Sequence, residues 1–175
     1  RNLEEFKSIA LDLSADVTVV KGTPAKAEIE TYTNLLEKIE TKISGGTLKL
    51  SSSGCLSAEK KIRIKITTPV LEGLEINGSG NILVPDTFMV DNINMEINGS
   101  GDIKASLVAA KAESEFHGSG NIILTGSANI NNVENMGSGK MEAQNLTCNE
   151  ASIEVNGSGD VYVYVIKKLD VEVNG

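Results

Sequence analysis

The tripeptide Gly-Ser-Gly occurs five times in this chain, and its spacing constrains the fold more than any other feature. The first glycine of each copy stands at position 78, 99, 118, 137 or 157, so the steps are 21, 19, 19 and 20 residues. A period near 20 residues is typical of a solenoid, in which each copy forms one coil and stacks on the next. Ten glycines are expected at structural corners: Gly78, Gly80, Gly99, Gly101, Gly118, Gly120, Gly137, Gly139, Gly157 and Gly159.

Apolar and polar residues alternate on both sides of each Gly-Ser-Gly, which predicts short strands with one buried face. Equivalent strands of successive copies should pair in parallel, about 4.8 Å apart. We therefore expect an all-β fold, a parallel β-solenoid of about 20-residue coils with glycine-rich corners. The second strand of each copy should stack one apolar side chain inside, in the column Ile82, Ile103, Ile122, Met141 and Val161.

The corners themselves suggest two reasons for glycine. Stacked bends bring backbone close to backbone, and a bend with positive φ disfavours side chains. Asparagines precede most corners, at Asn77, Asn98 and Asn156, and stacked asparagines can form amide ladders. The fourth copy has Asn135 where the others have an apolar residue, which predicts a local irregularity such as a bulge.

Residues 1–70 lack Gly-Ser-Gly but follow the same alternation less strictly. One coil is expected around a bend at 14–16, and a second around Gly45-Gly46. The segment KKIRIKI at 60–66 alternates strictly, with its isoleucines on one face, and NLLEKIETKI at 34–43 supports one short helical turn at most. We expect a single domain over residues 1–175, with less regular coils in 1–70 and repeat coils in 71–175.

The amino-acid composition limits the classes of partner that the chain is expected to bind. The net charge is −8, from 24 acidic and 16 basic residues, which disfavours nucleic acid and anionic membrane surfaces. No apolar run approaches the roughly 18 residues of a membrane span. The chain begins at Arg1 without methionine, so we expect any export signal or lipid anchor to precede it. Cys55 and Cys148 are interpreted as two thiols, and one long-range disulfide is the alternative.

Three segments carry a resemblance to a known family: FKSIALDLSADVTVVKG, NLLEKIETKISGGTLKL and the series of INGSGD copies. Together they resemble the bacterial head GIN domain, a family of auto-transporter adhesins common among Bacteroidetes. The resemblance spans essentially the whole chain. It implies a right-handed β-helix that is exported to the periplasm, the outer membrane or the cell exterior, and it brings no catalytic motif. The final VEVNG begins a sixth motif, so a further coil or cap is expected beyond it.

Catalytic and metal sites receive little support from the residues. The NGSGD copies are similar to calcium-binding GGxGxD repeats, but the period is too long and the second glycine pair is missing. Polysaccharide cleavage needs two carboxyl groups about 5–9.5 Å apart. Asp102 and Asp160 are three coils apart, roughly 14 Å at one strand spacing per coil, so they cannot form that pair. We expect no enzyme activity, no metal site and no cofactor.

Two features could serve interaction. A glutamate stands three residues before each motif glycine, on the outward face, and the column is Glu75, Glu96, Glu115, Glu134 and Glu154. It is either a solvated stripe that discourages aggregation or a docking strip for divalent cations or a basic partner. Tyr162 and Tyr164 should point outward, where they either bind a sugar ring or a partner, or cover the last coil.

The sequence therefore favours a non-enzymatic adhesin or cell-surface interaction module. Its partner would be a surface ligand, either glycan or protein, and a homo-oligomer is a further expectation. The alternative is a polysaccharide-binding or pectinase-like protein, because pectinases use β-helices.

Overall fold

In a computed structural model of the chain, which describes residues 1–54 and 62–174, strands form nearly all the regular structure. Seven short strands and one helical turn come first: β1 (Ser8–Leu11), β2 (Asp16–Lys21), β3 (Lys26–Glu30), α1 (Thr33–Leu36), β4 (Ile39–Ser44), β5 (Thr47–Ser52), β6 (Arg63–Thr68) and β7 (Gly73–Ile76). Five long strands follow: β8 (Asn81–Ile97), β9 (Ile103–Phe116), β10 (Asn121–Asn135), β11 (Lys140–Val155) and β12 (Val161–Val173).

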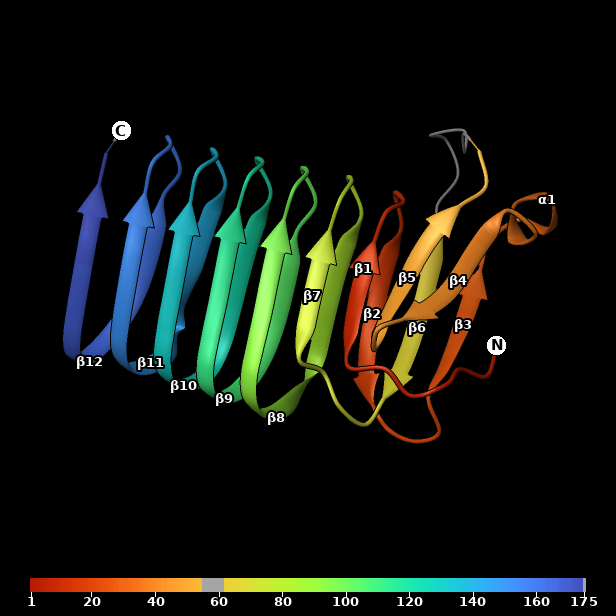
Figure 1. Ribbon diagram of the computed structural model, residues 1–175, viewed down its shortest axis with the longest axis horizontal. Helices are drawn as coiled ribbons and strands as arrows, with labels where there is room; N and C mark the ends of the chain where they lie inside the picture. Colours follow the sequence, from red (N-terminus) through yellow and green to blue (C-terminus); the bar gives the residue numbers. More distant parts are fainter. Residues whose placement is uncertain (55–61, 175) are drawn as a thin grey trace.

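The strands wind into a flattened, right-handed β-solenoid with a front and a back sheet (Figure 1). Each long strand descends in the back sheet, turns at the lower edge and rises in the front sheet to the next corner. Successive long strands pair in parallel, and their registers shift only around the lower turn, as between Val84 and Phe88. Apolar side chains from both sheets fill the space between them.

The Gly-Ser-Gly corners stack in one column along the upper edge, as predicted. From the second copy on, the backbone N–H of the serine donates to the first glycine carbonyl of the preceding corner, for example Ser100 to Gly78 at 3.0 Å and Ser119 to Gly99 at 2.9 Å. A Cβ on Gly99 would lie closer than 3.0 Å to the Gly78 carbonyl oxygen. Close backbone approach therefore explains these glycines. The expectation of positive φ was wrong, because none of the corner glycines has it.

The predicted interior column is confirmed. Ile82 pairs with Ile103, Ile103 with Ile122, and Ile122 with Met141, and all four side chains are buried. Val161 continues the column beside Met141 at the end of the core, where it is only partly buried.

Amide ladders also form, and two of them begin at an aspartate of the first coil. Asn98 Nδ2 donates to Asn77 Oδ1 at 2.9 Å, and Asn77 Nδ2 donates to Asp12 Oδ1 at 2.8 Å. On the far side of the corner, Asn81 Nδ2 donates to Asp16 Oδ1 at 3.0 Å. The ladders tie the repeat coils to the less regular coil beside them.

The irregularity predicted at Asn135 is absent, because β10 and β11 keep their register there. Asn135 faces the interior and is fully buried. Its Nδ2 donates to Gly139 O at 2.8 Å, and its Oδ1 accepts from the Gly137 N–H at 3.0 Å. The amide thus bridges its own corner, and a polar side chain fits an apolar slot because both of its ends are hydrogen-bonded.

The coils of the N-terminal part do not stack in chain order. The first coil, β1 and β2 with a bend between them, confirms the pattern expected for this segment. It lies between two later coils: β1 pairs with β5 on one side and β7 on the other, and β2 pairs with β6 and β8. The chain therefore passes beyond its first coil and returns across it before the repeats begin.

The second coil, which we expected around Gly45-Gly46, does not form, and the chain makes a hairpin there instead. β4 and β5 pair antiparallel as a hairpin, and φ is +59° at Gly45 and +78° at Gly46. Two consecutive positive φ angles are typical of a type I′ turn, which reverses a strand within one sheet. The expected helical turn is confirmed as α1. The isoleucines of 62–66 are buried as expected, with Ile64 and Ile66 on the inner face of β6 and Ile62 directly before it.

Antiparallel strands close the N-terminal end of the solenoid. β4 covers β5 in the front sheet, and β3 covers β6 in the back sheet. The Arg1 guanidinium donates to Ile39 O at 2.9 Å and to Leu36 O at 3.1 Å, and Asn2 bridges to Lys26. At the other end, β12 pairs with β11 alone in the described part of the chain.

Cys55 lies outside the described residues, and with it the suggested disulfide. Cys148 is buried, and its thiol donates to Tyr164 O at 3.3 Å. Burial raises the pKa of this thiol. In the described residues, no helix has the length and apolar character to span a membrane.

Candidate interaction surface

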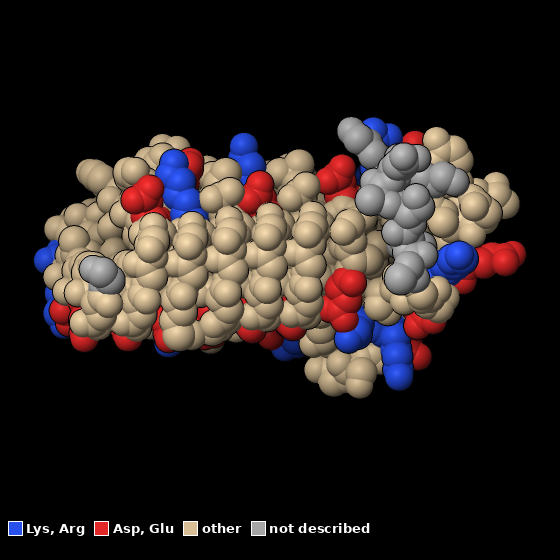
Figure 2. Space-filling view, turned by 90° about the horizontal axis from the view of Figure 1, so that it is seen from above, with Lys and Arg blue, Asp and Glu red and all other residues tan. Residues whose placement is uncertain are grey.

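The outward glutamates form one column across the front sheet. Strand register places each beside the next, because the strands pair in parallel without a shift in this region. The column contains Glu75, Glu96, Glu115, Glu134, Glu154 and Glu172. Neighbouring members are thus about one strand spacing, roughly 4.8 Å, apart along the backbone. Figure 2 shows acidic side chains along the front border of the uncharged corner ridge.

Asparagines hold most of these carboxylates in place. Asn77 Nδ2 donates to Glu75 Oε1 at 2.6 Å, and Asn98 repeats the bond to Glu96 at 2.8 Å. Asn156 and Asn174 make the same bond to the glutamates of their own coils, at 2.6 and 3.0 Å. At Glu115 the donor is replaced by His117, whose Nε2 lies 3.9 Å from the carboxylate. The column is therefore an ordered array.

Positive charge occupies the N-terminal end of the same column. Beyond Glu75 the register continues through Ala10 to Lys49 and then Lys42. Lys49 Nζ lies 2.5 Å from Asp12 Oδ2. Burial raises the pKa of Asp12, but the hydrogen bonds from Lys49 and Asn77 outweigh it and leave that pKa below its ordinary value. The front face thus changes from basic at the closed end to acidic over the repeats.

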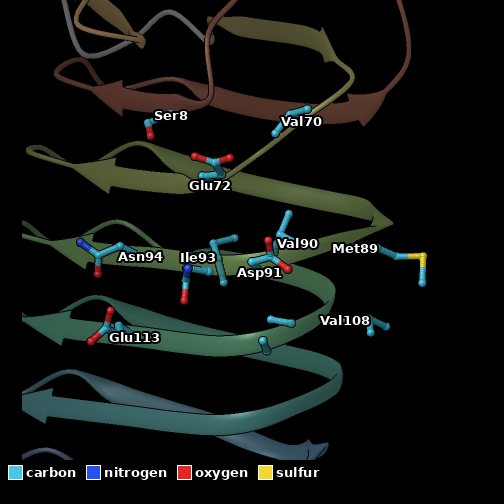
Figure 3. Close-up of a pocket in the computed structure, with 13 residues that line it drawn as sticks. Ser8, Val70, Glu72, Met89, Val90, Asp91, Ile93, Asn94, Val108 and Glu113 are labelled. Atoms are coloured by element: carbon cyan, nitrogen blue, oxygen red, sulfur yellow. The ribbon is translucent and has the colours of Figure 1, made fainter.

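An open hollow of about 870 Å³ lies in the lower part of this face. Its carboxylates are those of Glu72, Asp91 and Glu113, and its exposed apolar side chains include Met89 and Val108. Figure 3 shows these residues on the connection before β7, on the lower turns of β8 and β9 and, for Glu113, on the rising half of β9. Sequence reasoning missed the hollow because it forms where the chain crosses back over its first coil, and no motif marks that crossing.

Both predicted tyrosines point outward, on the back sheet. The column through Tyr162 contains Glu142, Ile123, Lys104 and Leu83, as expected from parity. Tyr162 is 48% exposed and Tyr164 56%. The Lys140 ammonium lies 5.0 Å from the centroid of the Tyr162 ring, where a cation–π contact is favourable. The alternating Val161, Val163 and Val165 pack against the core.

The corner ridge offers little chemistry. The second polar column places Asp102 beside Asn121, whose Nδ2 donates to Asp102 Oδ1 at 2.7 Å, and Asp160 follows two coils later. His117, the single histidine of the chain, faces Glu115 at the front. In residues 1–54 and 62–174, no three His, Cys, Asp or Glu side chains gather in a way that could hold a metal ion.

Comparison with known proteins assigns the chain to a family. Residues 5–175 match the family described as "Putative auto-transporter adhesin, head GIN domain". No curated protein matches the chain.

Several solved structures share the architecture. A "putative adhesin" from Bacteroides fragilis is 26% identical, with a TM-score of 0.90 over 100% of this chain and 83% of its own. A "putative lipid binding protein" from Parabacteroides distasonis is 17% identical, with a TM-score of 0.67 over 98% of this chain and 92% of its own. A "putative adhesin" from the same species is 16% identical, with a TM-score of 0.66 over 98% of this chain and 94% of its own. The chain belongs to the head GIN domain family of auto-transporter adhesins.

Proposed function

We propose that this protein is a non-catalytic, exported adhesion module, folded as one domain, that binds a basic protein ligand on the acidic part of its front face. The glutamate column is the observation that carries the proposal. Membership in an adhesin family supports the adhesive role, and the relatives from Bacteroidetes support an exported location, in the periplasm, on the outer membrane or outside the cell. The ligand class follows from the charge of the surface.

A cationic ligand would relieve a repulsion that is built into the sheet. Two carboxylates about 4.8 Å apart repel by about 1 kcal/mol even at the dielectric constant of water. The asparagine bonds orient the carboxylates, so little side-chain entropy is lost when a lysine or arginine approaches. The net charge of −8 would also steer a basic partner towards the protein.

The hollow extends this acidic surface and adds exposed apolar side chains to its carboxylates. Glu72 pairs with Lys7 at 2.9 Å, whereas Met89 is 73% exposed. A ligand side chain with an apolar stem and a cationic end, such as arginine, matches a space lined by carboxylates and aliphatic groups. The column would then align the ligand and the hollow would anchor it.

Binding to an array of host-matrix proteins and glycans tests the proposal. A variant with Glu96, Glu115 and Glu134 changed to glutamine should lose at least tenfold in affinity for its basic protein ligand, and the wild-type affinity should fall with salt. A control with Glu28→Gln, Glu37→Gln and Glu142→Gln makes the same change in net charge elsewhere. Equal loss in both variants would show only a net-charge effect and would contradict a site on the front face.

Glycan binding is the second candidate, and the two exposed tyrosines favour it. Tyr162 and Tyr164 stand on the same outer face, and aromatic rings presented this way can stack on sugars. Changing both to serine should abolish glycan binding without changing the melting temperature. If melting falls while binding persists, the rings only cover the last coil. The carboxylate pair weighed for pectinase-like cleavage, Asp102 and Asp160, stays three coils apart and therefore gives that activity no support.

A further inference from the structure

His117 and Met136 interrupt a series of asparagines along the front of the corner ridge. The residue that follows each front strand donates its backbone N–H to the last residue of the strand beside it, and the series is Asn77, Asn98, His117, Met136, Asn156 and Asn174. In four of these six coils, the asparagine side chain donates to the column glutamate two residues earlier in its own strand. His117 therefore places a titratable side chain where most coils have an amide.

The histidine does not reproduce the asparagine bond. His117 Nε2 lies 3.9 Å from Glu115 Oε2, which is too long for a hydrogen bond but within reach of an ion pair. An imidazolium at this position pairs with Glu115, whereas a neutral imidazole leaves both carboxylate oxygens available. The imidazole side chain is 35% exposed, so it exchanges protons with the solvent. The availability of Glu115 to a ligand therefore depends on the charge of His117.

Carboxylates of three neighbouring strands surround this histidine on the front face. The residues beside His117 in the series, Asn98 and Met136, are uncharged. The column glutamates of its own strand and of the two strands beside it are Glu96, Glu115 and Glu134. A protonated His117 thus adds a positive charge near the middle of the acidic array that the proposed ligand would contact.

The other charged groups around this corner are compensated. Lower on β9, Lys111 forms an ion pair with Glu113 at 2.7 Å. Across the corner ridge, Asp102 and Lys140 carry opposite charges and flank Asn121 in the second polar column. The glutamate column is therefore the main source of the electric field at the imidazole.

We propose that His117 makes the binding of a basic ligand to the front face pH-dependent, with tight binding at about pH 7.5 and release towards about pH 5.5. The proposal rests on the proposed function, because it concerns the same glutamate column. Histidine changes charge within this range, whereas solvated glutamates stay ionised through it. Protonated His117 pairs with Glu115 and repels the lysine or arginine of a ligand from the neighbouring carboxylates. By linkage, a bound ligand favours the neutral imidazole, so binding near pH 6.5 releases protons.

Two substitutions fix the two charge states. His117→Asn installs the side chain that most coils carry at this position, so the fold should tolerate it, and the column should stay available at both pH values. His117→Arg carries a permanent positive charge and mimics the protonated form. The probe is a fluorescent hexa-arginine peptide, because arginine keeps its charge throughout this range. Fluorescence anisotropy at constant ionic strength gives the dissociation constant.

The three proteins should differ in how their affinity depends on pH. The wild type should bind the peptide about threefold more weakly at about pH 5.5 than at about pH 7.5, as expected for one added surface charge several ångströms from the cations of the peptide. His117→Asn should bind like the wild type at the higher pH and lose almost nothing at the lower one. His117→Arg should bind weakly at both. An equal loss in the wild type and in His117→Asn would overturn the proposal, because the carboxylates themselves would then cause it.

The same measurements separate this proposal from the proposed function. If the wild type does not bind at about pH 7.5, or if changing Glu96, Glu115 and Glu134 to glutamine leaves the affinity unchanged, the proposed function is wrong and the pH dependence with it. If binding requires these glutamates but not the neutral histidine, only the pH dependence is wrong. Calorimetry in two buffers of different ionisation enthalpy provides a further readout near pH 6.5. The wild type should release protons on binding the peptide, and His117→Asn should release almost none; equal release from both would contradict the role of His117.

Discussion

Residues 1–70 and 71–175 use the same coil but assemble it differently. The repeat coils stack in chain order, β8 to β12, with each strand parallel to the one before it. In the N-terminal part, the first coil ends up between two later ones, and antiparallel β3 and β4 close the outside. The comparison shows that repetition extends a solenoid, whereas ending one requires strands that break the repeat.

The physical reason lies in the edge of the stack. A parallel coil always presents another open edge like the one it covers, so near-identical repeats cannot end the stack. An antiparallel strand with charged outward residues, such as Lys42 on β4, covers the core without inviting a further coil. The largest predicted effects follow from the stacking of like on like.

The largest difference in stability is expected between a glycine that stacks on another corner and a glycine that stacks on the first coil. Gly99 rests on a repeat corner, where an added Cβ would overlap the carbonyl of Gly78, and Gly99→Ala should cost more than about 3 kcal/mol of unfolding free energy. Gly78 rests on the first coil, where an added Cβ meets nothing within 4 Å. Gly78→Ala should therefore change the unfolding free energy by less than about 0.5 kcal/mol. Urea titration measures both, and equal losses would mean that stacking of corner on corner is not the constraint.

Two buried asparagines should show opposite effects within the repeats. Asn131 is fully buried, and neither its Nδ2 nor its Oδ1 has a hydrogen-bond partner. It lies between Ala112 and Ala151, so Asn131→Leu should raise the unfolding free energy by about 1 kcal/mol. Asn135→Leu instead removes two hydrogen bonds at a corner and should lower the unfolding free energy by about 2 kcal/mol. A loss at both positions, measured by thermal unfolding, would show that the interior cannot accept the extra volume.

The joint between the regions depends on Asp12. Asp12→Asn should lower the unfolding free energy by about 1 kcal/mol at neutral pH, because it weakens the contact with the half-exposed Lys49. The folded-state pKa of Asp12 lies below its ordinary value of 3.8, so its stabilisation is present above that pH and disappears as the pH falls through the lowered folded value. The stability difference between the wild type and the variant should therefore shrink in acid. A difference that stays constant from pH 7 to pH 2 would exclude the charge as its source.

The glutamate column should give the smallest effect. Glu115 stands between Glu96 and Glu134, so Glu115→Gln should raise the unfolding free energy by about 0.5 kcal/mol at low salt and by less at high salt. Glu142→Gln is the control, because it breaks an ion pair with Lys140 and should be slightly destabilising. Calcium at millimolar concentration should raise the melting temperature of the wild type if the column binds cations. An absence of response to charge and to calcium would leave a solvated face that only prevents aggregation.

The sequence predicted features that depend on the order of residues along one strand, and it failed for contacts made at the corners. Period-two alternation placed Ile103 and Ile122 inside and Tyr162 outside, because parity along a strand is a local property. The same alternation predicted an irregularity at Asn135 that does not form. The Asn135 amide is hydrogen-bonded by a backbone carbonyl and an N–H of its own corner, and no sequence pattern indicates these bonds. The sequence also led us to expect positive φ at the corners, and this was wrong. Glycine is required there because a side chain would overlap the backbone of the neighbouring coil. Gly45-Gly46, read as a coil bend, has the positive φ of a hairpin.

The sequence by itself determined the coil: its length, its glycine corner, its inward and outward faces, and the parallel register that aligns the glutamates. These follow from spacing along the chain, which fixes what one repeat places beside the next. Only the tertiary structure decided the position of the first coil between later ones, the hollow at the crossing, and the covering of the N-terminal coil by antiparallel strands. Those features depend on pairing between strands that are distant in the chain, and several pairings of similar strands satisfy the same alternation. The choice among them is made by the packing of the whole sheet, where Asp12, Lys49 and Asn77 meet from three separate segments.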